Sequence, residues 1–183
     1  MTDGAPAMVK VWDPLVRLFH WGLVLSFGVA WIAAEESRQV HLWAGYAAAA
    51  LIGFRLVWGL IGPGTARFAG FVTGPGTAIA YLADVARGDE RRYLGHNPAG
   101  GLMIVALIAT VAGLCLTGWL LTTDAFWGVE WVSDTHEALA NLLVALVIVH
   151  ICGVVLASFR HHENLALAMV TGRKRSAATT DMA

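Results

Sequence analysis

The sequence predicts an all-α fold, an integral membrane four-helix bundle with both termini cytoplasmic. Of its 183 residues, 57% are hydrophobic and only 14% are charged, which is too apolar for a soluble domain of this length. Four stretches are long enough to cross about 30 Å of hydrocarbon as helices, and they cover residues 15–34, 41–61, 98–121 and 135–158. Most basic residues lie before the first span, between the second and third, or after the fourth, so the positive-inside rule places these segments in the cytoplasm.

Two of the spans have recognisable beginnings. Trp12, Trp21 and Trp31 accompany the first apolar run and are typical of interfacial anchors, so we expect a retained span rather than a signal peptide. Asn97 followed by Pro98 predicts an N-cap and a first helical position at the start of the third span.

The segments outside the spans are Gly-rich or basic. Residues 77–87 predict a short amphipathic helix lying on the membrane surface, within a Gly-rich stretch that prolines interrupt. The chain after Thr171 is basic and then rich in Ser, Ala and Thr, which predicts disorder. We therefore expect one transmembrane domain over residues 1–175 and a disordered tail over 176–183.

Charge and cysteine content exclude two classes of function. The net charge is −1 and the basic residues are scattered, so nucleic acid is not expected as a partner. Cys115 and Cys152 both lie in apolar runs, where cysteine usually packs as a small apolar residue. The motif C-x-x-C-H is absent from the sequence, so any haem would be held without covalent attachment.

Four histidines fall at two depths in the predicted bundle. His136 and His150 are fourteen residues apart on the fourth span, about 21 Å of rise, and project from nearly one face. His41 opens the second span at the level of His136, and His20 lies in the first span near the level of His150. The pairs His41/His136 and His20/His150 follow, and two bis-histidine sites at two levels are what two b-type haems require.

Two arginines are candidates for binding the acidic groups of such a cofactor. Arg55 follows His41 by fourteen residues, so it falls near the inner level, where a buried guanidinium needs a counter-charge. Arg17 precedes His20 by three residues and can act in the same way. For Arg55, an extended side chain that reaches the membrane interface is an equal alternative.

The remaining histidines leave one alternative open. His96, at the start of the third span, can replace His20 as the partner of His150, because depth does not separate them. His161 and His162 lie beside Arg160 and Glu163 and are typical of a solvated cluster, with proton delivery to a quinone as an alternative role.

Several segments of the chain, in order, resemble the bacterial cytochrome b561 group, which includes the cytochrome b subunits of nickel–iron hydrogenases. They are VWDPLVRLFHWGL, HLWAGYAAAALIGFRLVWGLIGP, ARF, GHNPAGGLM, TGWLL and the long segment from HEALANLLVALVIVH to GRKR. The resemblance implies a four-helix membrane protein with two haems b, which passes electrons between the quinone pool and another redox partner. Carried over residue by residue, it gives His20, His41, His136 and His150 as ligands of iron.

The expected function is therefore electron transfer across the bacterial inner membrane, as in a respiratory chain, between quinone and a c-type cytochrome or other redox protein. A superoxide/quinone oxidoreductase of the same family is an alternative, so whether the protein is an enzyme stays open. A proton or metal-ion transporter lined by these histidines is a third alternative, although its spans would be expected to hold acidic residues. Lipid contact is expected, and a homodimer is possible on the sequence.

Overall fold

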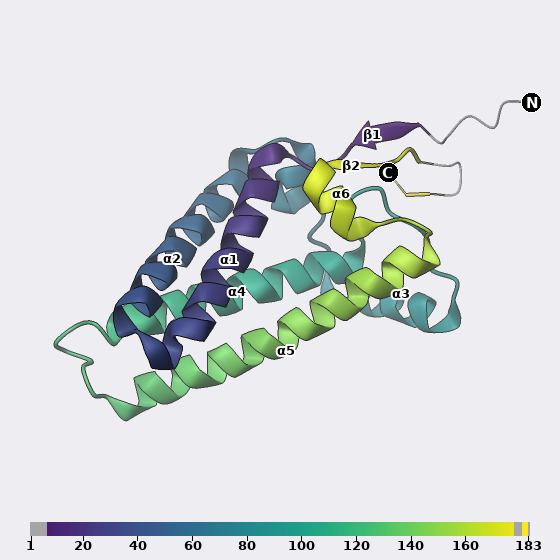
Figure 1. Ribbon diagram of the computed structural model, residues 1–183. Coiled ribbons are helices and arrows are strands. Elements are labelled where there is room, and N and C mark those ends of the chain that lie inside the picture. Colours follow the sequence, from purple (N-terminus) through teal and green to yellow (C-terminus); the bar gives the residue numbers. More distant parts are fainter. Residues whose placement is uncertain (1–6, 178–180, 183) are drawn as a thin grey trace, which may run out of the picture.

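The computed structural model describes residues 7–177 and 181–182, and its main elements are long helices (Figure 1). Four of the helices are long and apolar enough to cross a membrane: α1 (Pro14–Glu36), α2 (Arg38–Ile61), α4 (Pro98–Leu120) and α5 (Glu130–Arg160). Their ends agree with those of the predicted spans to within five residues. The all-α membrane bundle is thus confirmed, whereas the cytoplasmic location of the termini stays a prediction.

Capping side chains set where the first two helices begin. The Asp13 carboxylate accepts hydrogen bonds from the amides of Leu15 and Val16, and Pro14 occupies the first helical position of α1. Ser37 both ends α1 and caps α2 through its hydroxyl. A single residue therefore joins the two helices, which run back along each other as a tight pair.

The second pair of helices starts from the predicted cap. The side chain of Asn97 accepts a hydrogen bond from the amide of Gly100, and Pro98 is the first residue of α4, as the sequence predicted. Residues 121–129 connect α4 to α5 and include Gly128 with φ of 75°, a conformation that favours glycine. Helix α5 begins at Glu130, one turn before the expected start, because Glu130 to Asp134 continue the helix instead of the loop.

The bundle is assembled from these two pairs. Helix α1 packs along α2 and helix α4 along α5, while contacts of α2 with α4 join the pairs (Figure 1). A shared core cluster lies between them and includes Phe19, Ile52, Val111 and Leu143. Helix α5 buries only Val132 and Leu143 of its 31 residues, so most of its surface faces lipid or the space between helices.

Short elements cover the end of the bundle where α1 and α4 begin and α2 and α5 end, here called the terminal end. They are the 3₁₀ turns η1 (Gly64–Ala66) and η2 (Phe68–Gly70), helices α3 (Pro75–Arg87) and α6 (Leu165–Thr171), and strands β1 (Met8–Lys10) and β2 (Arg173–Arg175). The opposite end holds the Ser37 turn and residues 121–129, and is here called the hairpin end.

Helix α3 and strand β2 test two expectations for the segments outside the spans. The predicted helix at residues 77–87 is present as α3, which starts at Pro75 and leaves Ile79 and Leu82 exposed. The expectation of disorder directly after Thr171 is wrong for residues 173–175, because β2 pairs antiparallel with β1, from Met8 opposite Arg175 to Lys10 opposite Arg173. Part of the predicted tail, residues 178–180 and 183, lies outside the described residues.

A network of buried ion pairs connects several segments at the terminal end. The Arg92 guanidinium, 6% exposed, donates to the carboxylates of Glu163 and Asp181, and Lys174 lies 3.3 Å from Glu163. The Lys174 ammonium also donates to the carbonyls of Tyr93 and Leu94. The network therefore connects the segment before α4 with the segments after α5.

Candidate functional site

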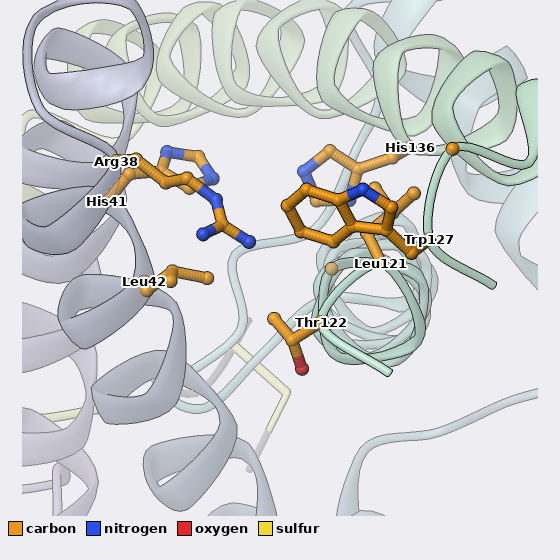
Figure 2. Close-up of a pocket in the computed structure, with 9 residues that line it drawn as sticks. Arg38, His41, Leu42, Leu121, Thr122, Trp127 and His136 are labelled. Carbon is orange, nitrogen blue, oxygen red and sulfur yellow. The ribbon is translucent and has the colours of Figure 1, made fainter. Parts of the chain in front are cut away.

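His41 and His136 face each other at the hairpin end, His41 from the first turn of α2 and His136 from the second turn of α5. Their ring centroids are 6.2 Å apart and their planes are 70° from parallel. Both rings line one cavity, together with residues from the loop that joins α4 and α5 (Figure 2). The two histidines that were paired from helix depth are therefore neighbours in the fold.

Hydrogen bonds to Nδ1 fix which nitrogen of each ring stays available. The Nδ1 of His41 lies 2.8 Å from the carbonyl oxygen of Ala30 on α1, and a carbonyl can only accept, so this nitrogen carries the hydrogen. The Nδ1 of His136 lies 2.9 Å from the hydroxyl of Thr117, which itself donates to the carbonyl of Gly113. In the neutral form of an imidazole with Nδ1–H, Nε2 keeps its lone pair for a ligand.

Helix α4 is shaped to receive the His136 ring. A Cβ at Gly118 would lie 3.1 Å from Cε1 of His136, so any larger residue would press on the imidazole. The neighbouring Thr117 is buried and turns its hydroxyl to the same ring. Gly118 and Thr117 together hold one orientation of His136.

The cavity lined by the two histidines has a volume of about 410 Å³. Its walls come from α2, the end of α4, the following loop and α5, and the lining residues are Arg38, His41, Leu42, Gly118, Leu121, Thr122, Trp127, Gly128 and His136. The Arg38 guanidinium lies 4.8 Å from the centre of the Trp127 ring, and Figure 2 shows these two side chains in front of the histidines.

A second group of polar side chains lies inside the bundle toward the terminal end. His20 on α1 and His150 on α5 are close enough for their charges to interact, and Nδ1 of His20 is buried without a hydrogen-bond partner among the described residues. The same is true of Nε of Arg17 and Nη1 of Arg55. Nε of Arg92, in the ion network, is also without a partner. A buried polar atom without a partner costs about 1–3 kcal/mol, and a polar ligand beside His20, Arg17 or Arg55 would remove that cost.

The sequence matches the family model described as prokaryotic cytochrome b561 over residues 11–172, most of the 183-residue chain. The chain belongs to the prokaryotic cytochrome b561 family. It is therefore a multi-pass membrane b-type cytochrome that takes part in electron transfer and binds haem b. The resemblance inferred from its motifs is confirmed. No curated protein matches the sequence.

The separation of His41 and His136 fits two imidazoles that would hold the iron of a haem b. Metal–nitrogen bonds of about 2 Å on opposite sides of one ion would place two imidazole centroids about 6 Å apart, and the observed separation is 6.2 Å. Among the described residues no group of three or more His, Cys, Asp or Glu side chains gathers as a metal site. Two imidazoles beside a cavity are what a metal needs when a macrocycle supplies its other four ligands.

Arg55 of the cytochrome is held inside the protein. It is 2% exposed, and its guanidinium lies 4.5 Å from the centre of the Phe68 ring and 6.0 Å from that of Phe71. Of the two alternatives for Arg55, the structure therefore has the buried one, not the one that reaches the interface. A Cβ at Gly59 would run into the Phe68 ring, so glycine at this position permits the packing.

His96 lies close to the same region, so both candidate partners of His150 are near it. The His96 ring is packed between Trp12 and Phe71, with centroid distances of 4.5 and 4.6 Å. Burial, followed by the positive charge of Arg55, lowers the pKa of His96 to about 3, which keeps this ring neutral. The alternative of His96 as a ligand in place of His20 stays open on these contacts.

Arg17, the other predicted cofactor-binding arginine, lies near the C-terminal segment. A Cβ at Gly172 would overlap its Nη1, so the guanidinium passes directly over this glycine. Gly172 has φ of 79° and its carbonyl accepts from the amides of Val11 and Trp12. The Arg17 side chain thereby extends from α1 to the turn that precedes β2.

Sequence reasoning missed three contributors to the site at the hairpin end: Thr117, Arg38 and Trp127. A hydroxyl in an otherwise apolar span was a usable signal for Thr117, and the one-turn spacing from His41 was a signal for Arg38. Nothing in the loop sequence indicated that Trp127 would cover the cavity.

Proposed function

We propose that this protein is a di-haem cytochrome b of the bacterial inner membrane, which passes electrons between the quinone pool and a c-type cytochrome or other redox partner. In this proposal His41 and His136 hold an outer haem, and His20 and His150 hold an inner one. The terminal end faces the cytoplasm, as the distribution of basic residues predicts.

The observation that carries the proposal is the facing pair His41 and His136, 6.2 Å apart, with both Nδ1 atoms already hydrogen-bonded. A ring fixed in this way needs no reorientation to bind a metal through Nε2. The partnerless polar atoms of His20, Arg17 and Arg55 support a second site toward the terminal end.

When bound, haem b supplies an iron that gains and loses one electron. The chain's own residues then have three tasks. Ala30 and Thr117 accept hydrogen bonds from Nδ1–H and so make the ligating nitrogens more electron-rich. Arg55 and Arg17 offer positive charge to carboxylates of the inner haem, and the apolar residues of the core cluster keep water out of the space between the two levels.

Haem counting tests the proposal. The pyridine haemochrome of the purified protein is expected to give two haems b per chain, and His136→Ala and His150→Ala are each expected to leave one. His162→Asn is the matched control, because His162 is exposed after α5 and has φ of 49°, which asparagine tolerates. One haem per chain in the wild type, or two in His136→Ala, would contradict the assignment.

The redox partners need a separate measurement. In nanodiscs, stopped-flow mixing with quinol is expected to reduce both haems, and a soluble c-type cytochrome is expected to reoxidise them. Faster reduction by superoxide than by quinol would instead support the superoxide/quinone oxidoreductase alternative. No reaction with either quinone or quinol would contradict the proposed link to the quinone pool.

A further inference from the structure

Arg38 is the basic residue among those that line the cavity at the hairpin end, and it stands one turn before His41 on the same helix. Other charged residues in the turn and loop at this end are acidic: Glu35 and Glu36 precede Arg38 in the chain, and Asp124 and Glu130 lie in and after the loop between α4 and α5. An exposed arginine in such surroundings would ordinarily pair with a carboxylate.

The structure shows a different arrangement. Within the described residues no carboxylate forms an ion pair with Arg38, and no acceptor for its N–H groups is found. The guanidinium lies against the Trp127 ring at 4.8 Å instead. Figure 2 shows it reaching across the cavity toward Trp127, with His41 and His136 behind. Trp127 thus holds the Arg38 guanidinium over the cavity, and the N–H groups of Arg38 stay available for a ligand.

We propose that Arg38, held in place by Trp127, binds a carboxylate of the outer haem and raises the reduction potential of that haem. This inference rests on the proposed ligation by His41 and His136. A guanidinium is planar and matches both oxygens of a carboxylate, whereas the lining residues Leu42, Leu121 and Thr122 offer no positive charge. Haem b carries two carboxylates, so a cavity for it needs such a partner at its rim.

The expected effect on potential follows from charge. A carboxylate near the iron disfavours the additional electron, and a cation paired with it cancels part of that influence. Arg38→Gln removes the cation, so the oxidised form gains relative to the reduced form. Arg38→Lys keeps the charge but lacks the planar guanidinium, so it is expected to lower the potential less than Arg38→Gln does. Trp127→Leu frees the Arg38 guanidinium and is also expected to shift the potential less than Arg38→Gln does.

Spectroelectrochemical titration of the purified cytochrome tests this inference after its haems have been counted. With two haems bound, Arg38→Gln is expected to lower the reduction potential of one haem by at least about 59 mV. For a one-electron couple, this shift corresponds to a tenfold change in the ratio of reduced to oxidised form. The shifted haem is the one that His136→Ala loses. The other haem stays unchanged and reports that the variant is folded.

Two variants are matched controls. Trp131→Leu removes an exposed tryptophan, also at the hairpin end, that does not line the cavity. Glu35→Gln changes the charge of the same turn without touching the cavity, so it measures the effect of charge at a distance, which salt screens. Both are expected to leave the two potentials within the error of the titration.

Four outcomes would overturn the inference. Unchanged potentials in Arg38→Gln with two haems bound would exclude a carboxylate contact. A shift of equal size but opposite sign in Glu35→Gln would assign the effect to general charge. Unchanged potentials together with an altered salt dependence of electron exchange with a soluble redox protein would make Arg38 a docking residue instead. A wild type without a haem at His41 and His136 would overturn the proposed function as well, and haem counting reveals this before any Arg38 variant is made.

Discussion

The two ends of the bundle solve the problem of buried polar groups differently. At the hairpin end, His41 and His136 have their Nδ1 atoms hydrogen-bonded within the protein, and both rings line an open cavity. Toward the terminal end, His20 and Arg55 hold polar atoms without a described partner, under a cover of short helices, strands and buried ion pairs. One site is organised by the chain alone, whereas the other has polar groups that a bound ligand would satisfy.

The largest expected effect separates His20 from His96 at the terminal end. His20→Ala is expected to lose one of two haems, while His96→Ala keeps both, because the His96 ring is already packed between Trp12 and Phe71. The pyridine haemochrome of each variant gives the count. Loss of a haem in His96→Ala with retention in His20→Ala would exchange the two residues in the ligand pair.

The next effect tests whether the hairpin end depends on its hydrogen bonds. Thr117→Val keeps the shape of the side chain but removes the acceptor for Nδ1 of His136, and loss of such a partner typically weakens metal binding about 10–100-fold. The rate of haem transfer to an acceptor apoprotein measures this weakening of haem binding. Thr110→Val is the control, since Thr110 is also buried on α4 but donates only to the carbonyl of Ala106. Equal rates in both variants would remove Thr117 from the site.

A smaller effect is expected from the fit of α4 against the His136 ring. Gly118→Ala places a methyl group 3.1 Å from Cε1 of His136, so the ring must tilt, whereas Gly113→Ala meets the flexible side chain of Leu139 at 3.0 Å. Electron paramagnetic resonance of the oxidised protein is expected to show a changed low-spin signal for Gly118→Ala alone. The same change in both variants would indicate a shift of the whole helix instead of the ring.

The smallest effect concerns the ion network of the terminal end. Burial alone raises the pKa of Glu163, but the hydrogen bond from Arg92 and the charge of Lys174 outweigh it and lower the pKa. A lowered folded-state pKa means that the carboxylate stabilises the fold above its ordinary pKa, about 4.3, and that this contribution is lost as pH falls through the folded value. A hydrogen bond to a charged group contributes about 1.5–3 kcal/mol.

Thermal unfolding between pH 7 and pH 3 checks that prediction. The wild type is expected to lose stability at the acidic end, and Glu163→Gln is expected to lower the unfolding temperature at pH 7 and flatten its dependence on pH. Asp84→Asn removes the partner of Arg87 in an exposed pair and is expected to change little. An unchanged pH dependence in Glu163→Gln would assign the acid sensitivity to other carboxylates.

The parts of this molecule that sequence could predict are those that depend on local chemistry. Uniform apolarity gave the four spans, Asn97 before Pro98 gave the start of α4, and helical rise placed His41 level with His136. Regular helices convert residue number into depth, which is why this pairing could be foreseen.

The missed parts depend on contacts between distant segments. The pairing of β1 with β2 joins residues more than 160 positions apart, and the burial of Arg92 depends on where Glu163 and Asp181 come to lie. The Ala30 carbonyl has no signature in the sequence, because every residue has one. The position of Trp127 depends on the path of the loop, which turns at Gly128 with a positive φ and lines the cavity.

In the proposed di-haem arrangement, the one-residue turn at Ser37 has a consequence for electron tunnelling. Since α1 and α2 share this capping residue, the offset along the membrane normal between His20 and His41 is fixed by helical rise alone. An engineered insertion there would rotate both faces and lengthen the gap that an electron must cross, whereas extra residues in the loop after α4 would leave that gap intact. Changing this distance without rotating the helix faces would therefore require whole helical turns to be added or removed, with the Ser37 connection kept.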